Sequence, residues 1–191
     1  MRSRGSSTGA VLVGFMGAGK SLVGRTLARR LDVEFVDVDD RVEAEAGKTV
    51  EEIFSSEGEQ AFRERERRAI CAAVSVPGRV IATGGGAFLD GENRDRLKAY
   101  APVIFLDVSP ATALKRLEGD TSRPLLAGKD RRKVVEELMA RRRPAYLDAD
   151  FRVSTENRPP DRVAEEVFRL LSRQRKGASW GRSEGKGRRK G

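Results

Sequence analysis

The amino-acid sequence predicts an α/β fold, a mostly parallel five-stranded sheet covered by helices on both faces. Short apolar runs alternate along the chain with stretches whose apolar residues recur at helical spacing. The first apolar run leads into a glycine-rich loop, and that loop opens directly into a helical stretch. The length of 191 residues suits one domain with a single buried core. In such folds, ligands gather at the carboxyl ends of the strands.

Five apolar runs predict strands, and the stretches between them predict helices. The expected strands cover residues 10–14, 34–36, 79–83, 102–108 and 151–153. The expected helices cover residues 20–31, 40–47, 50–57, 59–75, 91–99, 110–118, 131–146 and 160–172. The segment 119–130 is rich in turn-forming residues, and a loop of this length inside a compact domain is typical of a lid or a binding loop.

The two ends of the chain differ in composition from its centre. Residues 1–8 are expected to form a flexible start, and residues 9–172 a single domain. The segment 173–191 holds eight Lys or Arg against one Glu, so it carries most of the formal net charge of +9. Such a segment cannot bury enough apolar surface to fold alone. The sequence therefore predicts a basic disordered tail that could make weak contacts with polyanions.

Histidine is absent, and the only cysteine is Cys71. The chain therefore has no Ser-His or Cys-His nucleophile pair and no histidine metal site. A single cysteine permits no disulfide within the chain, which is typical of a reducing cytosol, and we expect Cys71 to be buried in a helix. No apolar run is long enough to cross a membrane. Any catalysis must therefore depend on carboxylates, Lys, Arg, backbone groups and a hard metal ion.

The glycine-rich loop fits the phosphate-binding pattern G-x-x-x-x-G-K-[ST], written here GFMGAGKS from Gly14 to Ser21. Its glycines let successive backbone N–H groups turn toward phosphate oxygens, and the following helix adds the positive end of its dipole. We expect Lys20 to reach the terminal phosphates of a nucleotide and the Ser21 hydroxyl to ligate Mg²⁺.

Acidic residues in two parts of the chain are candidate ligands of the metal ion. Asp37 and Asp39 follow the second expected strand, and in an extended segment residues two apart point the same way. One of them could hold Mg²⁺ while the other contacts the acceptor hydroxyl, or both could form a solvated acidic turn. Asp107 ends an apolar run in the manner of a Walker B strand. Residue chemistry alone does not separate Asp37 from Asp107.

Glycines and arginines supply further candidates. Three consecutive glycines at 84–86 let the backbone approach a ligand closely, although a tight turn would also use them. Arg63 lies one helical turn from Glu59 and Glu66, which favours a surface ion pair. Three consecutive arginines at 141–143 must spread around their helix. Planar arginine forks suit carboxylates and phosphates, so arginines near the site would fit an anionic acceptor.

Six segments, in this order, resemble the shikimate kinase family: GFMGAGKS, FVDVD, GEQAFRERE, ATGGGAF, RPLL and RRRPAY. The resemblance spans about residues 10–172. It implies a P-loop fold like that of nucleoside monophosphate kinases, a three-layer sandwich with parallel strand order 2-3-1-4-5 and a lid at about 119–130. It also implies ATP-dependent phosphorylation of the 3-hydroxyl of shikimate, an alcohol acceptor. Mg²⁺ is the implied cofactor, and the product serves chorismate and aromatic amino-acid biosynthesis.

The family's roles carry over to the matching positions of this sequence. The implied ATP-binding residues are Gly17, Ala18, Gly19, Lys20, Ser21, Leu22, Arg116, Arg123 and Arg158. The implied shikimate-binding residues are Asp39, Arg63, Gly84, Gly85, Gly86 and Arg142. Ser21 and Asp37 would hold the metal ion, and Lys20, Asp37, Asp39 and the lid arginine Arg123 would form the catalytic set. On this interpretation Asp107 only resembles a metal ligand, and Arg65, Arg141 and Arg143 are solvated surface charges.

The resemblance further implies a cytoplasmic monomer whose partners are shikimate and ATP, with no membrane partner and no specific nucleic-acid partner. Gluconate-type sugar-acid kinases and nucleoside monophosphate kinases use a similar loop, but neither accounts jointly for the FR, GGG and RPLL segments. The alternative outside the enzymes is a nucleotide-binding regulator or a nucleic-acid-binding protein that acts through its basic tail.

Overall fold

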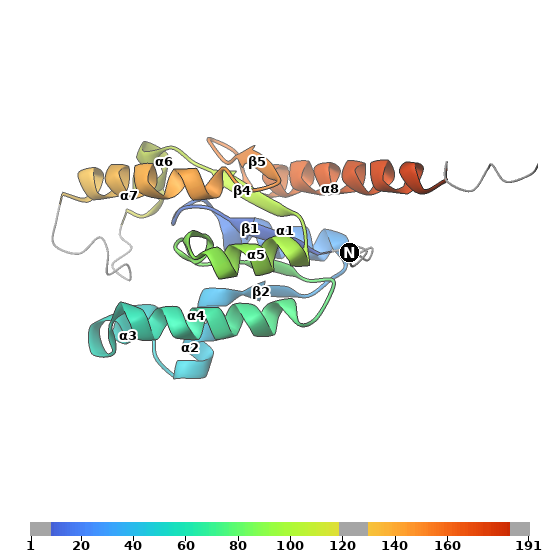
Figure 1. Cartoon of the computed structure of the whole chain (residues 1–191). Coiled ribbons are helices and arrows are strands. Elements are labelled where there is room, and N and C mark those ends of the chain that lie inside the picture. Colours follow the sequence, from blue (N-terminus) through green and yellow to red (C-terminus); the bar gives the residue numbers. More distant parts are fainter. Residues whose placement is uncertain (1–8, 119–129, 184–191) are drawn as a thin grey trace, which may run out of the picture.

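The computed structural model describes residues 9–118 and 130–183 (Figure 1). At its centre lie five strands, β1 (Ala10–Val13), β2 (Phe35–Asp37), β3 (Val80–Ala82), β4 (Val103–Asp107) and β5 (Phe151–Ser154). Their order across the sheet is β2-β3-β1-β4-β5, and all neighbouring pairs are parallel. The predicted strand order is confirmed. β1, β3 and β4 are buried along their whole length, as strands with helices on both faces must be.

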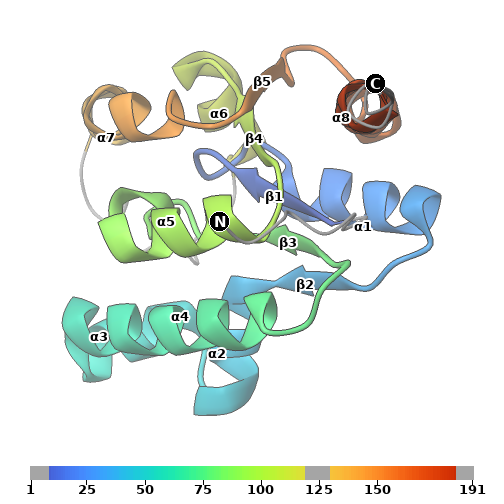
Figure 2. The same ribbon diagram turned by 45° about the vertical axis from the view of Figure 1, so that its right-hand side comes forward.

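Helices cover both faces of this sheet, which makes the predicted three-layer sandwich (Figure 2). On one face α1 (Lys20–Leu31) packs against α8 (Pro160–Ser183). The opposite face carries α4 (Gly58–Val74), α5 (Gly91–Tyr100) and α7 (Arg131–Tyr146). The remaining helices are α2 (Val38–Ala46) and α3 (Val50–Ser56), which contact α4, the short α6 (Pro110–Arg116) beside α7, and a 3₁₀ turn, η1 (Ala87–Leu89).

Side-chain caps explain where several helices begin. Thr49 and Glu52 form a reciprocal capping box at the start of α3. Asp90 and Asp130 accept backbone N–H bonds at the starts of α5 and α7, and Ser109 does the same for α6. Each of these caps satisfies donors that the first helical turn leaves without a partner, so the sequence fixes these boundaries locally.

Three sequence expectations are wrong in detail. The second helix begins at Val38, because Asp37 caps it by accepting the N–H of Asp39, so Asp39 lies in a helical turn and not in an extended segment. The last helix does not end at residue 172 but continues to Ser183, and of the added residues only 173–176 form an unbroken run of good helix formers. Cys71 is exposed, because the buried side of α4 is formed by other residues, Ile70 and Ala73 among them.

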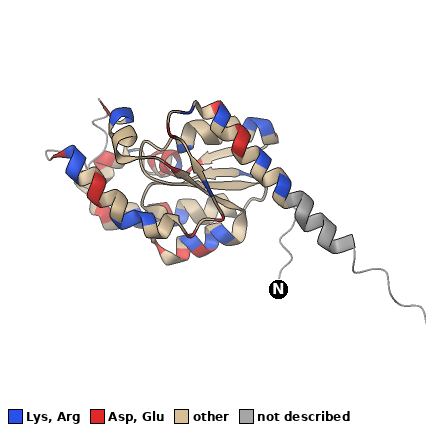
Figure 3. Ribbon diagram, turned by 90° about the horizontal axis from the view of Figure 1, so that it is seen from above, with Lys and Arg blue, Asp and Glu red and all other residues tan. Residues whose placement is uncertain are grey.

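Charged residues of both signs are interspersed along the helices (Figure 3). Many form ion pairs at the surface, for example Arg68 with Glu45 and Arg132 with Glu136. Within residues 9–118 and 130–183, no helix is both long enough and apolar enough to cross a bilayer. The expected lid, with Arg123, lies outside the described residues apart from residue 130, as do residues 1–8 and the last eight residues of the tail.

Candidate active site at the carboxyl ends of the strands

The phosphate-binding loop joins the end of β1 to the start of α1. Gly17 and Gly19 adopt the left-handed conformation, with φ of 77° and 87°, which glycine adopts without a steric penalty. Gly19 is the N-cap of α1, and no side chain caps that helix end. The N–H groups of the first turn therefore face the loop, where an anion can accept them. Lys20 Nζ donates to the carbonyls of Gly14 and Phe15, each at 3.0 Å, so its ammonium group lies within the loop.

Ser21 and Asp37 meet beside this loop. The Ser21 hydroxyl donates to Asp37 Oδ2 at 2.6 Å, which brings together one hydroxyl and one carboxylate oxygen. Mg²⁺ takes few protein ligands at nucleotide sites and completes its shell with water and phosphate oxygens. The described residues contain no cluster of three or more acidic, Cys or His ligands. The Ser21–Asp37 pair therefore fits a magnesium ion that arrives with a nucleotide.

Asp107 lies at the end of β4 and is already compensated by arginines. Its carboxylate accepts from Arg143 Nη1 at 3.1 Å and from Arg152 Nε at 2.8 Å. Asp37, in contrast, forms no ion pair with any residue that the structure describes. The geometry thus separates the two carboxylates that sequence chemistry left equivalent, and it favours Asp37 as the residue near the metal.

A cavity of about 530 Å³ continues from the phosphate loop between α1, α6 and the end of β5. Arg116 crosses one wall, where it donates to the carbonyls of Gly17 at 3.1 Å and Thr155 at 2.6 Å. Arg158 also lines the cavity, and its Nη1 donates to the carbonyl of Ser154 at 3.1 Å. Two of the three predicted nucleotide arginines, and the exposed Leu22 at the start of α1, therefore border the same space. Thr155, which sequence reasoning missed, anchors Arg116 there.

The three consecutive glycines follow β3 and face charged side chains at very short range. A Cβ on Gly84 would lie 2.6 Å from Asp39 Oδ1 and 2.7 Å from Glu66 Oε1. A Cβ on Gly85 would lie 3.1 Å from Arg142 Nη1, and one on Gly86 would lie 2.5 Å from Arg63 Nη2. A side chain at Gly84 or Gly86 would therefore have to displace these charged groups. The run is therefore glycine because charged groups converge on its backbone, and not only because the chain turns.

Arg63 and Glu66, both on α4, form a partly buried ion pair beside the glycines. Arg63 Nη1 lies 2.8 Å from Glu66 Oε2, and Arg63 Nη2 lies 3.1 Å from Glu59 Oε1. The Glu66 side chain is only 1% exposed. Burial raises the pKa of Glu66, the charge of Arg63 opposes this shift, and the charge of Asp39 adds to it. The expected ion pair is confirmed, but it lies within the site and not on the surface.

Sequence reasoning missed the burial of Glu66, although the pattern contains a signal for it. The buried positions of α4 include Phe62, Glu66, Ala69, Ile70 and Ala73, which recur at helical spacing. A carboxylate within an apolar stripe belongs on the inner face of its helix. One of its oxygens, Oε1, has no hydrogen-bond partner among the described residues. A buried oxygen of this kind marks a place where a polar ligand can bind.

Arg142 approaches the glycines from α7. It is 5% exposed, its guanidinium lies 5.6 Å from the centre of the Phe15 ring, and no carboxylate pairs with it in the described part of the chain. One turn further along, the Tyr146 hydroxyl donates to the carbonyl of Gly85. Burial raises the pKa of Tyr146 to about 12, so the hydroxyl keeps the proton that it donates. A nearly buried guanidinium without a carboxylate partner is suited to an anionic ligand.

The site has a small second compartment beside the phosphate loop. Its lining includes Asp39, Glu66 and Phe62, together with Arg63, Arg142 and the three glycines. Two guanidinium groups and a carboxylate can recognise a small molecule that carries both an anionic group and hydroxyl groups. Asp39 and Gly85 line this compartment and the nucleotide cavity alike, so they lie where the two compartments join.

We expected three arginines to be solvated surface charges, Arg65, Arg141 and Arg143, and this expectation is only partly correct. Arg141 is exposed as expected. Arg65 instead pairs with Glu57 and is 24% exposed, because α3 and α4 meet at that point. Arg143 pairs with Asp107, because α7 passes the carboxyl end of β4. Position along a helix alone did not reveal these partners, since they come from other elements.

A phosphate-binding loop on a parallel β2-β3-β1-β4-β5 sheet, next to a second compartment lined by two arginines, defines the class of protein. It is a P-loop kinase of the nucleoside monophosphate kinase-like fold. The model of the shikimate kinase family matches residues 16–172. The chain belongs to the shikimate kinase family.

Individual relatives agree with this assignment. A shikimate kinase from Persephonella marina is 43% identical over 157 residues, which cover 82% of this chain and 94% of that protein. A solved structure of shikimate kinase from Acinetobacter baumannii in complex with shikimate is 35% identical, with a TM-score of 0.86, and covers 88% of this chain and 95% of its own. A gluconokinase from Sinorhizobium meliloti, 15% identical with a TM-score of 0.59, covers 91% of this chain and 96% of its own and shares the fold alone.

Proposed function

We propose that the chain transfers the terminal phosphate of ATP to the 3-hydroxyl of shikimate, which gives ADP and 3-phosphoshikimate. This reaction is a step of chorismate and aromatic amino-acid biosynthesis. The observation that carries the proposal is the convergence of Arg63 and Arg142 on the glycine run, in a compartment that opens at Asp39 onto the phosphate loop. The likeness to a shikimate kinase that was solved with shikimate supports the same substrate.

The residues of the acceptor compartment bind and orient the substrate that receives the phosphate. Arg63 and Arg142 bind the carboxylate of shikimate from α4 and α7, and the backbone of Gly84, Gly85 and Gly86 holds the ring. Asp39 binds the acceptor hydroxyl at the mouth of the nucleotide cavity. Phosphoryl transfer demands in-line positioning and charge neutralisation more than a strong base. Asp39 therefore contributes chiefly by orienting the hydroxyl and accepting a hydrogen bond from it.

The residues of the nucleotide compartment neutralise the negative charge of the ATP phosphates. The N–H groups of Gly17, Ala18, Gly19 and the first turn of α1, up to Leu22, bind the phosphates, and Lys20 neutralises the β- and γ-phosphates. Arg116 stacks on adenine from the cavity wall, and Arg158 contributes at the same end. Arg123, which lies outside the described residues, completes the catalytic set with Lys20, Asp37 and Asp39.

Ser21 and Asp37 would hold Mg²⁺. Their oxygen atoms lie 2.6 Å apart beside the loop, so both can reach one hard cation or a water in its shell. When bound, the ion supplies positive charge to the oxygens of the transferring phosphate. Asp37 also caps α2, which fixes the direction of its carboxylate.

We further propose that residues 9–172 form the kinase domain and that the protein acts as a cytoplasmic monomer on small molecules, without a membrane or a specific nucleic-acid partner. The basic tail contributes at most weak contacts with polyanions.

The decisive experiment is an assay of ADP release with four acceptors: shikimate, gluconate, AMP and CMP. We expect turnover with shikimate only, and only in the presence of Mg²⁺. Turnover with a nucleotide or with gluconate, but not with shikimate, would refute the proposal. A chain that ends at residue 172 should retain activity, because the proposed site lies upstream. Absence of turnover together with tight binding of DNA or RNA at physiological salt would favour a nucleic-acid-binding protein.

A further inference from the structure

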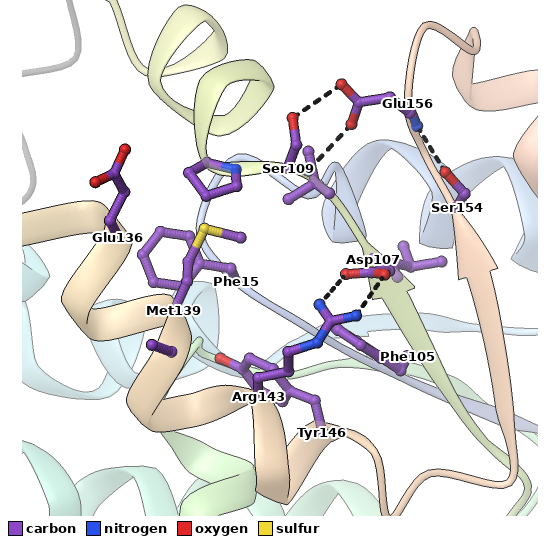
Figure 4. Close-up of a pocket in the computed structure, with 14 residues that line it drawn as sticks. Phe15, Phe105, Asp107, Ser109, Glu136, Met139, Arg143, Tyr146, Ser154 and Glu156 are labelled. Atoms are coloured by element: carbon purple, nitrogen blue, oxygen red, sulfur yellow. Dashed lines mark hydrogen bonds and ion pairs between the residues drawn. The ribbon is translucent and has the colours of Figure 1, made fainter. Parts of the chain in front are cut away.

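A hollow separates α7 from the carboxyl ends of β4 and β5. This cavity of about 510 Å³ is lined mainly by apolar side chains, among them Phe15, Phe105, Met139 and Tyr146, and it also borders Asp107 and Arg143 (Figure 4). Close packing normally fixes a helix against a sheet, and along this hollow α7 and the strand ends lack part of that direct contact. Tyr146 still packs α7 against the sheet, with its ring centre 5.1 Å from that of Phe105, and polar contacts along the hollow add to this packing.

The ion pair between Arg143 and Asp107 spans the hollow. In Figure 4 Arg143 projects from α7 toward the end of β4, and both of its terminal nitrogens face the Asp107 carboxylate. Nη1 lies 3.1 Å from Oδ1 and Nη2 lies 3.5 Å from Oδ2. The Asp107 side chain is only 11% exposed, and Arg152 on β5 binds it from another side. A two-point guanidinium contact of this kind fixes orientation as well as distance.

Arg142 is the neighbour of Arg143 on α7, and it enters the acceptor compartment. Successive residues of an α-helix point about 100° apart, so fixing Arg143 toward Asp107 also fixes the direction of Arg142. Arg142 has little freedom at its destination, since it is nearly buried and its guanidinium lies over the Phe15 ring. A small rotation of α7 would move its guanidinium away from the compartment.

We propose that Asp107 is a positioning residue that acts through Arg143: it sets the rotation of α7 and thereby places Arg142 against the carboxylate of the acceptor. The inference rests on the proposed function, in which Arg142 binds that carboxylate. It gives the side chain at the Walker B-like position a role without a metal ion. The backbone carbonyl of Asp107 accepts from Thr155 N at 2.8 Å, and substitution of the side chain leaves this bond available.

The test is a double-mutant cycle measured by steady-state kinetics on the full chain. Arg143→Met and Asp107→Asn are each expected to raise the KM for shikimate about three- to tenfold, with kcat and the KM for ATP changed less than about twofold. The double variant should be no worse than the poorer single variant, because either change removes the same ion pair. Arg152→Met is the matched control: it removes the other arginine from Asp107 but leaves the Arg143–Asp107 pair to α7 in place, so its KM for shikimate should change less than about twofold.

Three results would overturn the inference: additive effects in the double variant, an equal rise of KM in Arg152→Met, or a wild-type KM in Arg143→Met. Thermal unfolding of each variant identifies a fold defect, and because Arg143 is 43% exposed the Arg143→Met variant should fold even if Asp107→Asn does not. If the wild-type protein fails to turn over shikimate, the proposed function fails. If it turns over shikimate and Arg143→Met matches it, only the present inference fails.

Discussion

Gly86→Ala adds one methyl group at the point where Arg63 approaches the backbone. Gly86 has φ −104° and ψ −16°, a conformation that alanine adopts, so the substitution strains no backbone. The new Cβ would lie 2.5 Å from Arg63 Nη2, 2.7 Å from Nη1 and 2.8 Å from Cζ. The effect of the change is therefore confined to the position of the Arg63 guanidinium.

The distances set the size of the effect. Ordinary contact begins at 3.4 Å, so a group that would lie at 2.5 Å must move by about 0.9 Å. A displacement of about 1 Å in a group that positions the substrate can cost on the order of 100-fold in rate. We expect kcat/KM for shikimate to fall about 10- to 100-fold, which corresponds to about 1.4–2.7 kcal/mol. The free energy of unfolding should fall by only about 1 kcal/mol, because the obstructed atoms end a flexible side chain that can swing aside.

The assay compares kcat/KM for shikimate in four proteins: the wild type, Gly86→Ala, Arg63→Ala and the double variant. Arg63→Ala alone should lose roughly 30- to 1000-fold, the value expected for one arm of a largely desolvated carboxylate contact. If Gly86→Ala acts by moving Arg63, it should cost less than about twofold once Arg63 is gone. Gly91→Ala is the matched control, since its Cβ would meet nothing closer than 3.9 Å.

Two outcomes would refute this reasoning. A kcat/KM for Gly86→Ala within twofold of the wild type would mean that Arg63 does not need its observed position. A further tenfold loss in the double variant would mean that the methyl group acts on something else, such as the backbone of η1. Thermal unfolding accompanies the kinetics, because a loss of folded protein would otherwise imitate a loss of activity.

Three further predictions concern neighbouring groups. Arg142→Ala should lower kcat/KM for shikimate roughly 30- to 1000-fold while Arg141→Ala changes it about threefold or less, since only Arg142 is buried in the site; equal losses would contradict the assignment. Asp37→Asn should raise the Mg²⁺ concentration for half-maximal activity by about tenfold or more, and Asp107→Asn at saturating shikimate should leave it unchanged. Glu66 has a pKa raised above its ordinary value of 4.5, so its contribution to stability is present below pH 4.5 and is lost as the pH rises through the raised pKa. The Tm of the wild type minus the Tm of Glu66→Gln should therefore become smaller as the pH rises above 4.5. A difference in Tm that is constant with pH would show that burial does not perturb the pKa of Glu66.

The sequence by itself determined the fold and the phosphate site, because both depend on local patterns. Short apolar runs predicted all five strands, and helical spacing predicted the helices between them. The alternation of the two patterns predicted the parallel sheet. The loop from Gly14 to Ser21 needs only glycine freedom, one lysine and a helix start, which are all adjacent in the chain. The resemblance of six ordered segments then supplied the strand order and the family.

Tertiary structure decided what depends on partners from distant elements. Asp37 and Asp107 look alike as acids after apolar runs, and they differ only because Arg143 and Arg152 reach Asp107 while Ser21 reaches Asp37. Gly86 could have served a simple turn, and only the approach of Arg63 from α4 shows why it lacks a side chain. Electrostatic role and steric need are set by neighbours in space, and a sequence pattern records only neighbours along the chain.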